Sequence, residues 1–572
     1  MHGVYQTNIV AWAFGNGVMS QSLVNPKQRS ILFLVLPYML QKAAANRVKS
    51  RSYLAFPYGV LSIATYLERQ AKVNVNVEIL DLNLYDLDDV SIVLEKTLEA
   101  CKPEFVGISM MFDQSYRYVG AIASQIKSWN HKAIILLGGA SATTAWDEIL
   151  SEQSDVDALC YSEGEAAVSE LLASSDPFMA LQKDPWVTRE SLKMMRRPRT
   201  TYVDHLNDVV DIDYDLVDTS VYSMKEAFSP FASYRKENDV RQFFMVTSRG
   251  CPFKCVFCAE PSLHGASMRY ADIDAIIGHV ERMVDNYGMN VLTFYDDQLL
   301  LDTKRAKELF RRLTPFKLRL EAPNGVTLVY IDDEMAFLMK QAGFDTIPLA
   351  IESGSDHVLN KVIRKPLKVN KIKPVVRALQ RNGIFVQAFF VIGLPGEMDE
   401  HREETRQLIK DADLDWSGFS LATPVRGSAL YKICKEKGYI KEDLGIGEIE
   451  SNKYIIHAPD LGLEAEKITQ QAYQMNLDVN FVNNRHMRLG DYETAIRCFE
   501  EVIDRYDNHA FAHYYLAEAY AALSLRPDAV IKNRRRFTEL IDQDNDWRDY
   551  AASFGLLAEP ASEPSPPKHA IS

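Results

Sequence analysis

Three cysteines stand close together near the middle of the chain. Cys251, Cys255 and Cys258 are spaced Cys-x3-Cys-x2-Cys, so their thiolates can all bind one metal centre. In a four-iron, four-sulfur cluster they would fill three irons and leave the fourth without a protein ligand. An iron with an open coordination site can bind a cofactor or a substrate and reduce it. The spacing therefore predicts a 4Fe-4S cluster on this loop.

Two other interpretations of the cysteines stay open. One is a structural zinc site with His264 as the fourth ligand, and the other is three buried cysteines that bind nothing. Gly250 and Pro252 favour a tight ligand loop over a zinc knuckle. The sequence also has no second Cys-x2-Cys pair, which zinc sites of this kind commonly use.

The segment around the cysteines contains six strand–helix repeats, which predict a partial (β/α)6 TIM barrel. Its expected strands are residues 243–246, 291–295, 317–321, 346–351, 385–392 and 416–422. Catalytic groups of such barrels gather at the C-terminal ends of the strands, where the sequence places the cysteine loop together with Asp296, Asp297, Glu352, Ser353, Gly393 and Gly396. These acidic residues are candidates for binding cationic or hydroxylated groups, or they cap the next helix, as we expect of Asp302.

The segment before the barrel alternates strands and helices and predicts a doubly wound, Rossmann-like parallel sheet. Its expected strands are residues 31–36, 75–80, 105–110, 133–137 and 158–161. Ligands bind at the carboxyl ends of such strands, where Ser109, Gly138, Gly139, Glu163 and Gly164 stand. Glycines there let a backbone approach a large flat or phosphorylated ligand, or they only make a tight turn.

After about residue 454 the sequence predicts helices only. A helix over 463–481 is followed by small and aromatic residues at tetratricopeptide-like (TPR-like) spacing between 489 and 520. A single repeat cannot bury its own apolar face, so we expect it to pack on the barrel; a peptide-binding groove is the alternative. The predicted division is an arm (1–28), the doubly wound domain (29–175), a linker (176–240), the barrel (241–450), the helical region (451–550) and a disordered, proline-rich tail (551–572).

Composition limits the kind of partner. The chain of 572 residues is 47% hydrophobic and 25% charged, as in a soluble globular protein, and has no apolar run long enough to span a membrane. We find no signal-peptide pattern, and seven cysteines fit a reducing compartment. A net charge of −14 disfavours non-specific nucleic-acid binding. We therefore expect a cytoplasmic protein that acts on a small molecule, with neither nucleic acid nor membrane as partner.

The cysteine motif, with Phe257 before the third cysteine, resembles the radical S-adenosylmethionine (SAM) superfamily. The resemblance implies that the open iron chelates the amino and carboxylate groups of SAM and that an electron, from a donor such as flavodoxin or ferredoxin, releases a 5′-deoxyadenosyl radical. IESGSDHVLNKVIRK, with Glu352 and Ser353, resembles the segment that contacts the SAM ribose and methionine. FFVIGLPGE, with Gly393 and Gly396, resembles the strand that backs the adenine. FYDDQLLLD replaces the usual glycine-glycine-glutamate motif, so Asp296 or Asp297 is the expected partner of the SAM amine.

The N-terminal segment resembles the cobalamin-binding domain that precedes many radical SAM domains. The matching pieces are FPYGVLSIATYL, VEILDLN, FVGISMM, IILLGGASAT and DALCYSEGEAAVSELL. They imply that Ser109, Gly138, Gly139, Glu163 and Gly164 face the corrin. The loop PYMLQKAAANR lacks the histidine that ligates cobalt in cobalamin mutases, so the resemblance implies a corrin without a protein imidazole, or a domain that has lost cobalamin.

Together the two implied cofactors favour a cobalamin-dependent radical SAM methyltransferase (EC 2.1.1.-). The radical would abstract hydrogen from an unactivated carbon, methylcobalamin would deliver the methyl group, and a second SAM would recharge the cobalamin. The expected substrate is an unactivated carbon, or a phosphinate phosphorus, of a small natural product.

Three other functions stay open at this stage. The first is a rearrangement, cyclisation or ring contraction without methyl transfer. The second is tRNA methylthiolation, which the isolated Cys101 and Cys160 and the helical C-terminus disfavour, because that family carries a second set of cluster cysteines. The third is a non-catalytic adaptor that recruits a partner through its helical end, against which the cysteine triplet argues.

Overall fold

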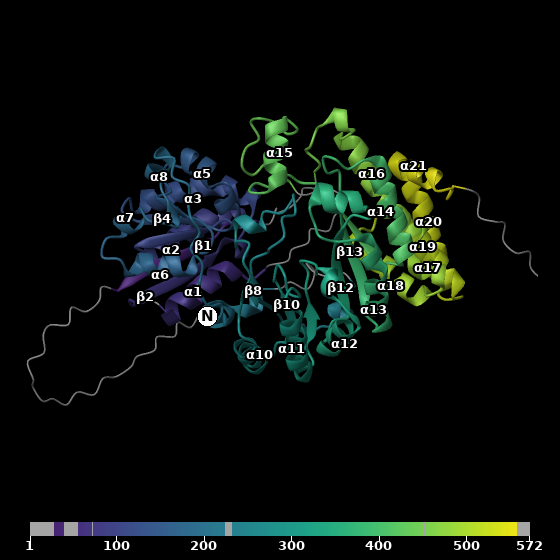
Figure 1. Ribbon diagram of the computed structural model, residues 1–572, viewed down its shortest axis with the longest axis horizontal. Helices are drawn as coiled ribbons and strands as arrows, with labels where there is room; N and C mark the ends of the chain where they lie inside the picture. The colour runs from purple at the N-terminus through teal and green to yellow at the C-terminus, as the bar shows by residue number, and fades with distance from the viewer. Residues whose placement is uncertain (1–27, 39–54, 71, 223–230, 451–452, 558–572) are drawn as a thin grey trace, which may run out of the picture.

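The computed structural model describes residues 28–38, 55–70, 72–222, 231–450 and 453–557. Three units follow one another across Figure 1: an N-terminal sheet domain in blue, a barrel in teal and green, and C-terminal helices in yellow. The predicted α/β architecture with a helical end is confirmed. The predicted arm, apart from residue 28, and the tail from residue 558 lie outside the described residues. No helix in the described ranges has the length and apolar character needed to cross a membrane.

The sheet domain is built on one six-stranded sheet whose first five strands are parallel. Alternate residues of the central strands enter two separate cores, because successive side chains point to opposite faces. Helices α1 and α6 cover one face, and α2 and α3 cover the other. The strand order is β2 (Val75–Asp81), β1 (Arg29–Val35), β3 (Phe105–Ser109), β4 (Ile134–Gly138), β5 (Ala158–Cys160) and β6 (Trp186–Val187). The helices are α1 (Tyr58–Gln70), α2 (Val90–Cys101), α3 (Tyr116–Trp129) and α6 (Glu165–Ala173).

The segment 176–240, which we predicted as a linker, carries structure of its own. Strand β6 pairs antiparallel with β5, so the sheet extends beyond residue 175. Helix α9 (Asn207–Val210) contacts α1, and the buried Tyr214 donates a hydrogen bond to Phe244 O in the barrel. The sequence did not predict β6 and α9, because elements of two and four residues are too short to produce a periodic hydrophobic pattern.

The barrel consists of six parallel strands in sequential order. They form two three-stranded sheets, which two isolated parallel bridges, Leu320 to Phe344 and Val326 to Leu349, connect. The sequence placed the third strand two residues too early, because Lys317 adopts a left-handed conformation. The strands are β7 (Gln242–Met245), β10 (Val291–Phe294), β11 (Arg319–Glu321), β12 (Thr346–Glu352), β13 (Phe385–Ile392) and β14 (Trp416–Leu421). Asp302 caps α11 (Thr303–Leu313), as predicted.

The C-terminal helices cover β14, the last strand of the barrel. Helix α16 (Ala465–Leu477) ends in a wide turn, and from that turn the Asn480 carboxamide pairs with both backbone groups of Ser417 at 2.9 and 2.8 Å. Trp416 packs edge-on against Phe481 at the same junction. The remaining helices are α17 (Arg485–Leu489), α18 (Tyr492–Arg505), α19 (Ala510–Ala522), α20 (Pro527–Gln543) and α21 (Asn545–Ser553), which crosses the boundary predicted at residue 550.

Candidate active site

The three cysteines lie on a loop that closes on itself. Strands β8 (Ser248–Arg249) and β9 (Arg269–Tyr270) pair antiparallel at its base. Cys251 N donates to Gly265 O at 3.1 Å, and Val256 N donates to Ile363 O at 2.9 Å, which ties the loop to the barrel. A Cβ on Gly250 would lie 2.4 Å from Ser267 O, so the loop requires glycine there.

The surroundings of the three thiols suit sulfur ligands of a metal. Gln298 Nε2 donates to Cys251 Sγ, and Glu260 N donates to Cys258 Sγ, both at 3.5 Å. Burial raises the pKa of Cys255 to about 11 and that of Cys258 to about 12, and the charge of Lys365 partly opposes the rise at Cys255. The free thiols therefore hold their protons at neutral pH, and a metal centre must displace them.

The zinc interpretation finds no support in the positions of the side chains. A zinc ion holds its ligands at about 2.0–2.3 Å around one point. Among the described residues, no three His, Cys, Asp or Glu side chains converge in that way. His264 instead bonds to Glu163 at 2.9 Å. A cubane cluster spreads its cysteines over three irons, so it does not require convergence on one point.

The structure separates the roles of Asp296 and Asp297. Asp296 is buried and accepts hydrogen bonds from Thr247 N, Thr247 Oγ1 and Ser248 Oγ, at 2.6 to 3.1 Å. Its Oδ1 atom accepts from all three donors and thus holds the strand end before the cysteines. Burial and the neighbouring Glu260 carboxylate raise the pKa of Asp297 to about 9, so these two carboxyl groups share a proton.

Glu260, whose carboxylate is paired with Asp297, was not among the residues predicted from the sequence. Its Oε1 atom is buried without an ordinary donor among the described residues. It lies 4.0 Å from His264 Nε2, and its charge acts on both Cys251 and Cys258. An additional donor would satisfy Glu260 Oε1, and a positive charge would stabilise the carboxyl pair.

Glu352 and Ser353 lie at the end of β12, beside the cysteine loop. Glu352 has a φ of +72° and pairs with Lys365 at 3.0 Å, and both side chains are buried. Their charges act on Cys255 with opposite sign. Ser353 Oγ accepts Ser355 N and contacts Thr405 Oγ1, so it shapes the turn after the strand.

The glycine-rich turn after β13 is held from both sides. Gly393 N donates to Glu397 Oε2 at 2.6 Å, and Gly393 O accepts the Tyr454 hydroxyl at 2.5 Å. Gly393 and Gly396 have φ values of +89° and +101°, which favour glycine. Phe257, between the second and third cysteines, packs against the apolar cluster that includes Leu394.

Small residues line the C-terminal edge of the sheet domain. Ser109 and Gly138 are paired in register at the ends of β3 and β4. Gly139 has a φ of +111°, and a Cβ there would lie 2.6 Å from Met110 O. Gly164 packs on Ile63 of α1. Gly139 and Gly164 thus serve close packing, whereas a Cβ on Gly138 would meet only Cys160 Cβ, at 3.9 Å. Contact of these glycines with a corrin stays a prediction.

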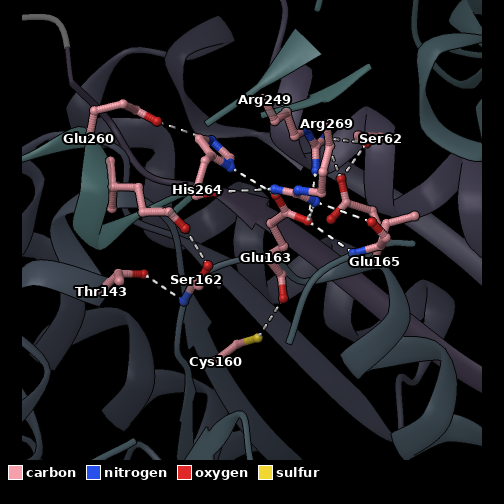
Figure 2. Close-up of polar contacts among 12 residues, drawn as sticks. Ser62, Thr143, Cys160, Ser162, Glu163, Glu165, Arg249, Glu260, His264 and Arg269 are labelled. Atoms are coloured by element: carbon pink, nitrogen blue, oxygen red, sulfur yellow. Dashed lines mark hydrogen bonds and ion pairs between the residues drawn. The ribbon is translucent and has the colours of Figure 1, made fainter. Parts of the chain in front are cut away.

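Glu163 lies between the two domains and not on an open ligand edge. Its carboxylate accepts hydrogen bonds from His264 and Arg269 of the cysteine loop (Figure 2). The side chain is only 2% exposed, and these partners occupy both oxygens. The sequence could not indicate this, because the partners are about a hundred residues away.

The C-terminal edge of the sheet domain faces the C-terminal mouth of the barrel. Ser162 Oγ donates to Leu263 O on the cysteine loop (Figure 2). On the other side, Arg426 after β14 pairs with Glu148 at 3.2 Å and lies 3.5 Å from Asp113. A ligand held on the first edge therefore lies opposite ligands held by the barrel.

Apolar side chains are exposed on this edge. Met111 and Phe112, which follow β3, are 49% and 45% exposed, and Phe112 packs on Tyr38 at 5.1 Å between ring centroids. Met110, one residue earlier, is fully buried in the core of the sheet domain. Exposed apolar side chains beside a ligand edge commonly contact the ligand.

A cavity of about 1300 Å³ lies elsewhere, between β14 and the C-terminal helices. Trp416, Phe419, Tyr473, His509 and Trp547 are among its lining residues, and none of the lining residues belongs to the cysteine loop or the sheet domain. This cavity is therefore separate from the candidate active site.

Sequence reasoning missed three residues near the cysteines: Glu260, Gln298 and Lys365. Gln298 follows the two aspartates directly, and Lys365 ends the segment that begins with Ile351. Gln298 and Lys365 could have been found, because they lie in FYDDQLLLD and IESGSDHVLNKVIRK, the segments compared with the radical SAM superfamily. Nothing in the sequence distinguished Glu260 from a surface carboxylate.

Two family profiles match the chain. The Radical SAM superfamily matches residues 245–409, and the B12 binding domain matches residues 47–172. Cytidylyl-2-hydroxyethylphosphonate methyltransferase of Streptomyces wedmorensis is 25% identical over 426 residues, 70% of this chain and 79% of that protein. An anaerobic magnesium-protoporphyrin IX monomethyl ester cyclase of Cereibacter sphaeroides is 25% identical over 318 residues, 53% of this chain and 49% of that protein.

Two solved structures share the fold. The radical SAM methyltransferase TsrM from Kitasatospora setae has a TM-score of 0.54 at 18% identity and covers 72% of this chain and 77% of its own. The cobalamin-dependent radical SAM enzyme OxsB has a TM-score of 0.57 at 12% identity and covers 94% of this chain and 82% of its own. The chain therefore contains a B12 binding domain followed by a radical SAM domain, and the cofactors of these two domains are cobalamin and a 4Fe-4S cluster with SAM.

Proposed function

We propose that this protein is a methyltransferase that places a methyl group on an unactivated carbon, or a phosphorus, of a small molecule. The observation that carries the proposal is that the corrin-binding edge of the sheet domain faces the barrel mouth that holds the cysteines. Contacts on two sides of the junction, at Ser162 and at Arg426, keep these surfaces opposite each other. When bound, the three cofactors supply a carbon-centred radical and a transferable methyl group.

The residues present fit each cofactor. Cys251, Cys255 and Cys258 would hold the cluster, because each is a free thiol and backbone or side-chain N–H groups reach two of them. Asp297 and Glu260 would receive the SAM ammonium, which supplies a donor for the buried Glu260 Oε1 atom and a positive charge for the carboxyl pair.

Other residues would orient SAM and the corrin. Glu352, held by Lys365, and the turn at Gly393 would contact SAM, as the resemblance implies. Met111 and Phe112 would exclude water from one side of the corrin. Asp296 is buried and its Oδ1 atom holds three protein donors, so we no longer expect it to contact SAM.

The relatives favour methyl transfer. Besides the phosphonate methyltransferase, the similar proteins include a bacteriochlorophyllide d C-12(1)-methyltransferase and a hopanoid C-2 methylase. The molecules named in these three activities are unlike one another, so the relatives support the reaction type and do not identify the substrate of this chain.

A second candidate is cyclisation or another rearrangement without net methyl transfer. The observation that favours it is the similarity to the anaerobic cyclases. The two candidates differ in mass balance, since only methyl transfer adds carbon to the product. tRNA methylthiolation and an adaptor role rank below both.

The test is anaerobic incubation of the reconstituted enzyme with methyl-deuterated SAM and candidate substrates. Methyl transfer predicts a product that is heavier by a deuterated methyl group, whereas a rearrangement predicts a product without label. Cys255→Ala should abolish reductive SAM cleavage without unfolding the chain, and retained cleavage would contradict the assignment of the cluster.

A further inference from the structure

Glu163, on the loop between β5 and α6, accepts hydrogen bonds from several segments that follow the sheet domain in the chain. Its oxygens lie 2.9 Å from His264 Nδ1, 2.6 and 2.9 Å from two nitrogens of Arg269, and 3.1 Å from Val203 N (Figure 2). Arg249 Nη1 lies 3.3 Å away. One buried carboxylate thus joins the sheet domain to three segments of the rest of the chain.

A second carboxylate, Glu165, completes the network. Its carboxylate accepts hydrogen bonds from Arg249 Nη2 at 2.7 Å and from Ser62 Oγ at 2.6 Å. Arg249 therefore bridges the carboxylates of Glu163 and Glu165 (Figure 2). Burial alone would raise the pKa of Glu163, but the bonds from His264 and Arg269 and the charge of Arg249 lower it. Two carboxylates and two guanidinium groups therefore balance each other away from water.

The basic partners flank the cluster ligands in sequence. Arg249 stands just before Cys251, while His264 and Arg269 follow Cys258. Residues 249 and 269 are paired in the two-stranded ribbon at the base of the loop. Glu163 therefore binds both ends of the ligand loop at once, and its effect reaches the cysteines through the backbone.

The loop that carries Glu163 also belongs to the corrin-facing edge. Ser162 has a φ of +79°, and its N–H donates to Thr143 Oγ1 at 3.1 Å, next to the turn after β4 (Figure 2). The same serine contacts Leu263 O. This is where the edge that would hold the corrin touches the loop that would hold the cluster.

We propose that Glu163 is a positioning residue that fixes the distance between the cysteine loop and the corrin-binding edge of the sheet. The inference rests on the proposed function, because that distance matters only if SAM and cobalamin react across it. It replaces our prediction that Glu163 binds cobalamin directly, since its oxygens are already used by protein donors.

The test compares Glu163→Gln with a matched control, Glu104→Gln. Glutamine keeps the size of the side chain but removes the charge that opposes Arg249 and Arg269. Glu104 pairs with Arg29 inside the sheet domain, at the other end of β1 from the corrin-facing edge. A general effect of losing an ion pair would appear in both variants.

The first measurement is hydrogen exchange of the cofactor-free protein. We expect residues 248–270 to exchange faster in Glu163→Gln and residues 346–352 of β12 to stay unchanged. The second measurement, in enzyme loaded with cluster and cobalamin, is the magnetic interaction between cob(II)alamin and the reduced cluster. We expect a broader distance distribution, and a rate of methyl transfer from SAM to cobalamin that is about 10- to 100-fold lower, at unchanged iron and corrin content.

Unchanged exchange of residues 248–270, or an unchanged distance distribution, would overturn the inference. If Glu163→Gln does not fold, Arg269→Lys decides, because it keeps the charge and loses the two-pronged contact. A wild-type protein that retains neither cluster nor corrin would contradict the proposed function instead. The exchange measurement on cofactor-free protein would still test the positioning.

Discussion

Two adjacent aspartates should respond in opposite ways to the same substitution. Asp296→Ala removes the acceptor of three buried donors, which are Thr247 N, Thr247 Oγ1 and Ser248 Oγ. Each buried donor left without a partner costs about 1–3 kcal/mol. Burial also raises the pKa of Asp296, so removing its buried charge returns part of this cost, and because the hydroxyls can rotate, we expect a net loss near about 3 kcal/mol. At about 2–4 °C per kcal/mol for a domain of this size, the Tm of the barrel should fall by roughly 10 °C.

Asp297→Ala should leave the Tm of the cofactor-free protein unchanged or raise it. Burial and the Glu260 charge raise the pKa of Asp297 to about 9, far above the ordinary value of 3.8. An acid whose pKa is raised in the folded state destabilises that state at every pH above its unfolded pKa, so its removal relieves a cost at pH 7. In the reconstituted enzyme, the SAM ammonium would lose one of its two carboxyl acceptors, which should weaken SAM binding by about tenfold or more.

The assay is thermal unfolding of both variants without cofactors, followed by a spectroscopic SAM titration of the reconstituted enzymes below the Tm of each. The reasoning would be refuted if Asp296→Ala kept its Tm, or if it weakened SAM binding as much as Asp297→Ala while the latter remained stable. Either result would return the SAM amine to Asp296.

Three further predictions concern other parts of the chain. Gly139→Ala should lower the free energy of unfolding by about 1–3 kcal/mol, because φ is +111° and the new Cβ would lie 2.6 Å from Met110 O. Gly138→Ala should be tolerated, because its Cβ would have its nearest neighbour at 3.9 Å. Equal Tm values for the two variants in thermal unfolding would contradict this prediction. Burial lowers the pKa of His509 from 6.5 to about 3, so the stability it contributes is present above pH 6.5 and falls by about 2 kcal/mol at pH 5. His509→Asn keeps the cap on Ala512 N, and its denaturation midpoint should depend less on pH over that range; an equal dependence would refute the assignment. Asn480→Ala should expose the helical region to limited proteolysis, because Ser417 N and O lose their partners at a cost of about 2–4 kcal/mol, and an unchanged digestion pattern would contradict the role of this side chain.

The sequence was sufficient for the features that repeat locally. Alternating strands and helices predicted both parallel sheets, and the spacing of Cys251, Cys255 and Cys258 predicted the ligand loop, because each depends on neighbours a few residues away. It could not predict that Glu163 bonds to His264 and Arg269, since such pairs form only when two domains meet. It also missed β6, whose two residues carry no periodic signal.

The carboxamide of Asn480 caps one point on the outer edge of β14, the last strand of the barrel. Its oxygen accepts from Ser417 N and its nitrogen donates to Ser417 O, as the backbone of a neighbouring strand would. A side chain thus pairs the edge of β14 at that point. A shortened gene product that lacks the last hundred residues would present a bare strand rim beside Trp416 and Phe419. Such a product should self-associate, so soluble fragments for crystallisation need to retain the helices.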